Sequence, residues 1–210
     1  MMGASSRHCA AGCALLLAPA FAWAADDEAT DGVHAGATFS YYAMRDQPDF
    51  SMGVATLERG RLHLEARYNY EGRDAASAFA GWKLEGGDEV RWQVTPIAGV
   101  LFNKARGAAL GFEAAVSAGR FDAYVEAEGV RDLEARDASY LYAWSEIGWS
   151  AAKWLRIGLA GQRTRLVDSA RDVQPGAFAQ VLAGPATIAV YAFDPDRGSR
   201  YFVVALAGRF

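Results

Sequence analysis

Apolar and charged residues alternate along RLHLEARYNYE, residues 61–71. Leucine, alanine and tyrosine occupy the even positions, and charged or polar residues occupy the odd ones. Successive side chains of a β-strand point to opposite faces, so this stretch predicts a strand with one apolar and one charged face. In a soluble sandwich the apolar face would be buried. In a membrane barrel the same face would contact lipid, and the charged face would line the lumen.

Similar segments continue down the chain from Gly36, each of about the length, 9–11 residues, that spans a bilayer as a tilted strand. About a dozen strands are predicted. Merging two weaker segments around residues 36–58 would reduce the number to ten, so ten and twelve both remain open. The predicted strands are residues 36–44, 50–58, 61–71, 76–85, 89–101, 107–117, 120–130, 138–149, 153–165, 177–183, 186–193 and 200–210.

The links between these segments alternate between short and long. The short links are residues 59–60, 86–88, 118–119, 150–152 and 184–185, and the long ones are 45–49, 72–75, 102–106, 131–137, 166–176 and 194–199. Outer-membrane barrels have short periplasmic turns and longer external loops, whereas a soluble sandwich has no reason to sort its links in this way. The alternation therefore favours an all-β, antiparallel up-and-down transmembrane barrel with a monomeric lumen.

Aromatic residues on the apolar parity support the same interpretation. Four of them, Trp82, Trp92, Phe121 and Trp149, lie near the short links, where an aromatic belt would meet the membrane interface. Pro96 falls inside a predicted strand and predicts a bulge there, because proline cannot donate a ladder hydrogen bond.

The N-terminal segment has the features of a cleaved secretory signal peptide. Arg7 precedes an apolar run, and Ala22-Trp23-Ala24 forms an A-x-A site, which predicts removal of residues 1–24. Both cysteines lie inside this segment, so the exported chain is expected to form no disulfide. The polar, acidic residues 25–35 predict a flexible periplasmic leader, and residues 36–210 form the predicted barrel.

Composition excludes two other classes of protein. After removal of Arg7 with the signal peptide, 25 acidic residues face 20 Lys and Arg, which gives a formal charge of −5. That balance does not support nucleic-acid binding. No later segment offers the run of about 18 uncharged apolar residues that a transmembrane helix needs, so a closed barrel is the membrane-spanning alternative.

The final strand, RYFVVALAGRF, places its apolar residues on one parity and ends in phenylalanine. Together with the signal peptide and the repeated strands, it resembles the assembly signal of bacterial outer-membrane β-barrel proteins, carried here by Phe202, Val204, Leu206 and Phe210. The resemblance implies a Gram-negative outer-membrane location, with lipid, lipopolysaccharide and the barrel-assembly machinery as partners. Small barrels of this kind include solute channels and a lipid hydrolase. A secreted or periplasmic antiparallel barrel or sandwich is the alternative.

If the side chains at the apolar positions of each strand face lipid, the side chains at the alternate positions line the lumen. Basic residues dominate its first strands and acidic residues the following ones. Opposite charges on different walls would form a polarised constriction that orients solutes. Alternatively, the charges would pair and fill a narrow barrel. The candidate lumen residues are Arg61, His63, Glu65, Arg67, Lys83, Arg91, Glu113, Asp122, Tyr124, Glu126, Glu128, Tyr142, Trp144, Glu146 and Arg156.

Aromatic residues share this parity, including Tyr124, Tyr140, Tyr142 and Trp144. Beside carboxylates, such rings could stack a sugar or a base. Simple filling of the lumen, or a girdle at the rim of the pore, is the favoured interpretation.

Enzymatic chemistry has little support in the sequence. The exported chain keeps only two histidines, His34 and His63, and no cysteine, so no zinc constellation or other cofactor is expected. A barrel lipid hydrolase would need a Ser–His pair at the lipid surface, whereas His63 is assigned to the lumen. Glutamates such as Glu126 and Glu146 could act as an acid–base pair, but pore or ion-pair roles suit them better.

The sequence therefore predicts a narrow passive channel for small polar solutes, with a charge-polarised lumen. A closed structural or interaction barrel is the main alternative, with external loops 131–137 and 166–176 binding a partner or lipopolysaccharide. A barrel-embedded enzyme ranks third. Whether the lumen is open or filled is left to the structure. In the channel, four basic residues would face four acidic residues across the lumen. The basic residues are Arg61, Arg67, Lys83 and Arg91, and the acidic ones are Glu113, Asp122, Glu126 and Glu146.

Overall fold

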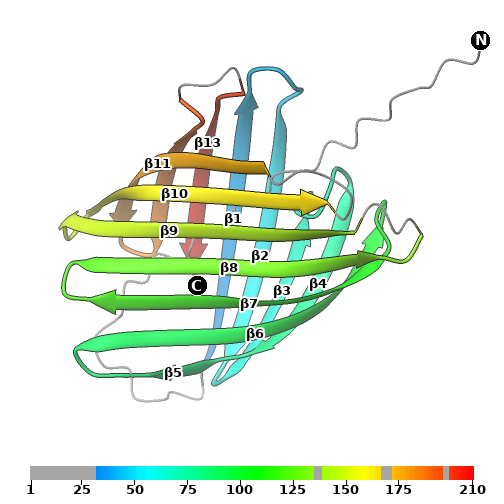
Figure 1. Ribbon diagram of the computed structural model, residues 1–210. Coiled ribbons are helices and arrows are strands. Elements are labelled where there is room, and N and C mark those ends of the chain that lie inside the picture. The colour runs from blue at the N-terminus through cyan, green and yellow to red at the C-terminus, as the bar shows by residue number, and fades with distance from the viewer. Residues whose placement is uncertain (1–31, 135–138, 167–171, 196–198) are drawn as a thin grey trace, which may run out of the picture.

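The computed structural model describes residues 32–134, 139–166, 172–195 and 199–210 (Figure 1). The predicted signal peptide and residues 25–31 of the predicted leader lie outside the described residues. Within the described part of the chain, no helix is long and apolar enough to cross a membrane.

The described residues form thirteen β-strands. They are β1 (Val33–Met44), β2 (Phe50–Arg59), β3 (Leu62–Tyr68), β4 (Ala75–Trp82), β5 (Leu84–Gly86), β6 (Val90–Asn103), β7 (Gly107–Ala118), β8 (Phe121–Asp132), β9 (Tyr140–Ala152), β10 (Leu155–Leu166), β11 (Asp172–Ala183), β12 (Ala186–Phe193) and β13 (Tyr201–Arg209).

All neighbouring strands pair antiparallel, and the sheet closes on itself because β1 pairs with β13 and β4 pairs with β6. β5 continues β4 along the same partner, β6, so the thirteen strands make twelve spans of an up-and-down barrel. In Figure 1, β6–β10 cross the near wall at a steep angle to β13 and β1–β4 on the far wall, as tilted barrel strands do. The closed, twelve-span antiparallel barrel predicted from the sequence is confirmed.

The interruption between β4 and β5 occurs at Lys83, between the pairs Gly81–Ile97 and Leu84–Val94. By the register of these pairs, Lys83 lies opposite Thr95 and Trp82 lies opposite Pro96, which has no N–H to donate to the ladder. β6 itself passes Pro96 without a register shift. The predicted bulge at Pro96 is therefore wrong, and the irregularity falls on the partner strand instead.

Short and long connections alternate as predicted, except that the β5–β6 and β6–β7 links are both three residues long. Three two-residue turns contain a glycine with positive φ, Gly60 (54°), Gly119 (59°) and Gly184 (60°), a conformation that costs glycine little. β1 begins and β13 ends on the side of these short turns, where Ala35 and Phe210 exchange backbone hydrogen bonds of 2.8 and 3.1 Å. Because outer-membrane barrels have short periplasmic turns, we expect this side to face the periplasm, and we call the two ends periplasmic and external in that sense.

The exterior is mostly apolar, as lipid contact requires, and the exposed Arg131, Arg163 and Arg165 lie at the long-loop ends of β8 and β10. The four aromatic residues predicted for the belt, Trp82, Trp92, Phe121 and Trp149, are 40–63% exposed. Phe202, Val204 and Leu206 also point outward from β13. Large apolar side chains at this exposure would be costly in water but stable in a bilayer.

Three predicted boundaries or faces are wrong. β1 begins at Val33, inside the predicted leader, and β11 begins at Asp172, inside the predicted loop 166–176. Tyr70 was assigned to the lipid face but is 1% exposed inside the barrel. β3 ends at Tyr68 and Asn69 has a φ of 61°, so the strict alternation stops before Tyr70 and turns its side chain inward.

Candidate functional site: the barrel lumen

The charged face of β3 points into the barrel. His63, Glu65 and Arg67 are at most 5% exposed, whereas Leu64 and Ala66 between them are exposed to the outside. The same alternation places most of the predicted lumen residues inside. Ten are buried: His63, Glu65, Arg67, Tyr124, Glu126, Glu128, Tyr142, Trp144, Glu146 and Arg156. Four are half-buried: Lys83, Arg91, Glu113 and Asp122.

Arg61 departs from this arrangement. It lies in the two-residue turn before β3 and its side chain is exposed, so the charged wall begins at His63. The alternation in the sequence begins at Arg61, one residue before β3 begins at Leu62. For this reason the pattern alone assigned Arg61 to the lumen.

Arg67 is the centre of the largest ion-pair cluster. Its Nε and Nη2 lie 2.8 and 3.1 Å from the two carboxylate oxygens of Glu65 on the same strand. From the opposite wall, Glu126 and Glu128 of β8 approach its two Nη atoms at 3.1 and 3.0 Å. All four side chains are at most 1% exposed. The guanidinium thus joins β3 to β8 through the middle of the barrel.

Two aromatic rings hold the Arg67 guanidinium in place. Its Cζ lies 4.1 Å from the ring centres of both Tyr70 and Phe79, an arrangement that favours a cation through the ring quadrupole. The Tyr70 hydroxyl donates a 2.7 Å hydrogen bond to Glu126. Arg67 therefore has aromatic as well as acidic partners, and none of these aromatic contacts was predicted from the sequence.

Arg156 on β10 forms a second cluster. Its Nη1 lies 2.7 Å from Glu146, its Nε lies 3.0 Å from Asp122, and its Cζ lies 4.5 Å from the Phe178 ring centre. Gly148 leaves room for this side chain, because an added Cβ there would lie 2.4 Å from the Arg156 Nε. The three charged residues were predicted for the lumen, and the structure brings them into direct contact.

Both arginines pair with acids around them, so the side chains do not form the basic wall and the separate acidic wall that were predicted. Lys83 likewise contacts Glu58 on β2, at 2.8 Å, rather than the acids of β7–β9. The reason is geometric: long side chains from neighbouring and facing strands reach one another in a narrow barrel. Pairing and filling, the second interpretation of the lumen charges, describes these contacts.

A layer of aromatic rings closes the external half of the lumen. Phe193 and Tyr201 stack with ring centres 4.9 Å apart, and Tyr42 stacks on Phe50 at 4.3 Å. Trp144 packs edge-on against Phe193 at 5.3 Å. Only Trp144 of these five was a predicted lumen residue. The available signal was that both parities of residues 201–206 are apolar, which indicates an interior face that is also apolar.

Access to the interior differs between the two ends. Near the short turns, the side chains of Glu58, Asp122 and Lys83 are 33%, 23% and 16% exposed. At Arg67 and at four rings of the aromatic layer, Tyr42, Trp144, Phe193 and Tyr201, exposure falls to 0–1%, whereas Phe50 is half-buried. The lumen thus has a filled centre, with partly exposed charged side chains near the short turns.

The fold is that of outer-membrane β-barrel proteins. No protein-family model matches the sequence, and no curated protein does so. Among solved structures, the KdgM porin has a TM-score of 0.64 at 7% sequence identity, with 83% of this chain and 99% of that chain covered. The same porin in complex with disordered oligogalacturonate has a TM-score of 0.65 over the same fractions. At this identity the likeness shows the fold alone.

Proposed function

We propose that the protein is a narrow passive channel of the bacterial outer membrane for small polar solutes, with a preference for cations. The observation that carries this proposal is the excess of acid in the lumen. Six connected or neighbouring glutamates lie around Arg67, Lys83 and His63, and Arg91 and Arg209 are further bases on this side of the barrel. The glutamates are Glu58, Glu65, Glu71, Glu113, Glu126 and Glu128. A lumen lined by excess carboxylates attracts cations and repels anions.

Burial of so many ionisable groups favours a transport role over a purely mechanical one. An ionised side chain in a dry interior costs several kcal/mol unless it is paired, and apolar residues would fill the same space at lower cost. Three buried carboxylate oxygens, on Glu71, Glu126 and Glu128, have no hydrogen-bond partner among the described residues. Such groups are suited to contact with water or a passing cation.

In this proposal Arg67 is the gate. The filled centre is the closed state, and passage requires separation of the ion pairs that join β3 to β8. The porins that share the fold support a channel as the general class, while the solute preference is inferred from this chain's own side chains. The cleaved signal peptide, outer-membrane location and assembly through the C-terminal strand belong to the same proposal.

Planar-bilayer recording tests the channel. We expect small, infrequent step currents from the wild-type protein and larger ones from Arg67→Ala, because the substitution removes both the central side chain and its ion pairs. Loss of one partner of a buried pair costs about 3–5 kcal/mol, so folding must be checked by heat-modifiable electrophoretic migration. Glu126→Gln serves as a milder variant, for which we expect weaker cation preference in reversal-potential measurements.

Arg61→Ala is the matched control, since that arginine is exposed in a turn and should leave the currents unchanged. If neither the wild-type protein nor folded Arg67→Ala gives step currents over a range of voltages and salts, the channel proposal is wrong.

The second candidate is a closed structural or interaction barrel, and a specific observation favours it. Eleven large inward-facing side chains, Trp144 and Glu126 among them, are less than 2% exposed. External loops would then contact lipopolysaccharide or a protein partner. This candidate predicts no currents from either protein in the recordings above. That the chain is not an enzyme stays a prediction.

A further inference from the structure

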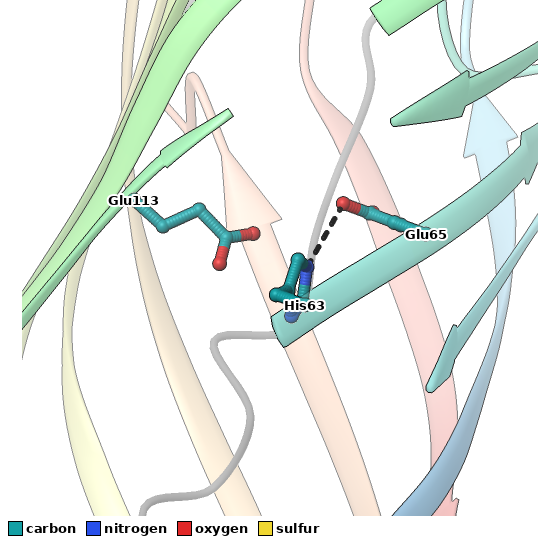
Figure 2. A group of neighbouring side chains, drawn as sticks. All are labelled: His63, Glu65 and Glu113. Atoms are coloured by element: carbon teal, nitrogen blue, oxygen red, sulfur yellow. Dashed lines mark ion pairs between the residues drawn. The ribbon is translucent and has the colours of Figure 1, made fainter. Parts of the chain in front are cut away.

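His63, Glu65 and Glu113 meet inside the barrel near its periplasmic end. His63 and Glu65 come from β3, and Glu113 comes from β7. The strands β4 and β6 lie between β3 and β7 in the barrel wall. Figure 2 shows the Glu113 carboxylate extending toward the imidazole from the facing wall, with an ion pair drawn between His63 and Glu65. One potential ligand atom of each residue lies within 4.8 Å of the other two.

The His63 ring is oriented for ligation. Its Nδ1 lies 3.1 Å from a carboxylate oxygen of Glu58, which accepts the proton of that nitrogen. Glu58 is in turn held by the Lys83 ammonium at 2.8 Å. Metal-binding histidines are commonly oriented in this way, with a carboxylate fixing the tautomer through the ring nitrogen that does not bind the metal.

The other ring nitrogen has no hydrogen-bond partner. His63 is 5% exposed, and its Nε2 is one of the buried polar atoms left unpaired among the described residues. It points toward Glu65, whose Oε2 lies 3.6 Å away, too far for a hydrogen bond. A buried ring nitrogen that faces two carboxylates without a hydrogen bond is where a metal ion could replace the proton of the imidazole.

We propose that His63, Glu65 and Glu113 bind one divalent transition-metal ion. One imidazole nitrogen and two carboxylate oxygens suit Zn²⁺ or Mn²⁺, and a water would complete the coordination. Ligand atoms at bond lengths of about 2.0–2.2 Å lie roughly 3.4 Å apart in a tetrahedral site. The three side chains therefore need to move inward by about an ångström, which the half-buried Glu113 can accommodate most easily.

The local charge supports a divalent cation. Both carboxylate oxygens of Glu65 accept hydrogen bonds from Arg67, and Oε2, which lies 3.6 Å from His63 Nε2, would bind the metal through its second lone pair. Glu113 has no ion pair with Lys or Arg among the described residues, although it lies in a buried wall of β7. A bound cation would balance the negative charge of the Glu113 carboxylate. The sequence did not indicate this site, because Glu113 lies far along the chain from His63 and only barrel closure brings them together.

This inference goes beyond the channel and does not depend on it. The test uses the full exported chain, folded in detergent micelles and stripped with a chelator that is then removed. Titration calorimetry with Zn²⁺ alone measures affinity and stoichiometry. Absorption of bound Co²⁺ reports the ligand set. We expect one Zn²⁺ per chain, and at least a tenfold loss of affinity in each of His63→Ala and Glu113→Gln.

Glu58→Gln tests the positioning role of Glu58, for which we expect a 10–100-fold loss of affinity with the Co²⁺ coordination otherwise retained. The controls are Glu89→Gln in the exposed turn before β6 and His34→Ala, which removes the second histidine of the exported chain. Both should bind like the wild-type protein.

The proposal is overturned if the wild-type protein binds no Zn²⁺ at a one-to-one ratio. It is also overturned if folded Glu113→Gln binds as tightly as the wild-type protein, or if binding disappears in His34→Ala instead. Folding of each variant is checked by heat-modifiable migration, and if His63→Ala does not fold, Glu113→Gln and Glu58→Gln decide the outcome. Channel recordings are unaffected by these results, so failure of one proposal is distinguishable from failure of the other.

Discussion

Asp49, just before β2 in the first external loop, accepts two hydrogen bonds. The Tyr41 hydroxyl donates to it at 2.6 Å and the Met44 backbone amide donates at 2.9 Å. These bonds favour the ionised carboxylate, the Tyr41 bond most strongly, and they lower the pKa of Asp49 below its ordinary value. The resulting contribution to stability is present above the pKa of the unfolded chain and is lost as the pH falls through the folded value.

Replacement of the donor should reverse this effect. We expect Tyr41→Phe to raise the pKa of Asp49 toward its ordinary value, because the largest cause of the shift is removed. Carboxyl ¹³C chemical shifts recorded against pH in micelles measure it. Tyr68→Phe is the matched control, since that tyrosine is also at the external rim but bonds Asp74. An unchanged Asp49 pKa in Tyr41→Phe would show that the Met44 amide dominates.

Within the β4–β6 pair, a glycine and an aromatic ring position the central arginine. Phe79 and Gly99 lie directly opposite each other, and a Cβ added to Gly99 would lie 2.4 Å from the Phe79 ring. The ring covers the glycine, and Arg67 stacks on the ring. The absence of a side chain at Gly99 on β6 therefore fixes the position of the Phe79 ring and, through it, the position of the Arg67 guanidinium.

Gly99→Ala is expected to displace Phe79 and destabilise the barrel by about 1–3 kcal/mol, as overpacked interiors usually do. Urea unfolding in lipid vesicles, followed by tryptophan fluorescence, gives the free energy. Gly53→Ala on β2 provides the comparison, because nothing lies within 4 Å of an added Cβ there. Equal stability of the two variants would mean that Phe79 can move aside without loss.

For the whole molecule, closure depends on the pairing of the first strand with the last. β1 and β13 pair from Gly36–Arg209 to Met44–Tyr201, and Phe210 extends the seam through its backbone bonds to Ala35. The Phe210 ring itself is 82% exposed and contributes little to packing. Its side chain is thus free to serve in recognition during assembly, as the resemblance implies.

Phe210→Ala keeps both backbone bonds and removes only the ring. We expect a lower fraction of folded barrel in the outer membrane but little change in the stability of purified, refolded protein. Cell fractionation with heat-modifiable migration measures the first quantity, and urea unfolding measures the second. Deletion of Phe210 should lower both, by about 1–3 kcal/mol in stability for two lost bonds. Normal assembly of Phe210→Ala would remove support for the assembly signal.

Much of the fold follows from local pattern. Alternation in residues 62–67 assigns Leu64 outward and Arg67 inward correctly, because side-chain direction has a period of two in any strand. Link lengths likewise predicted a closed barrel of about twelve spans, and the structure decided between ten and twelve. The same rule failed at Tyr70 and Arg61, where the chain leaves regular strand geometry and the period no longer applies.

Contacts across the lumen follow from closure and strand tilt, which no local pattern specifies. The alternation placed Arg67 and Glu128 on inward faces, but their meeting requires β3 and β8 to lie on facing walls at matching heights. The same holds for Glu113 and His63 at the candidate metal site. Residue type and parity thus established which side chains enter the barrel. Their pairing, the filled centre and the sharing of charge came from the three-dimensional arrangement, because long side chains in a narrow lumen reach partners that are distant in sequence.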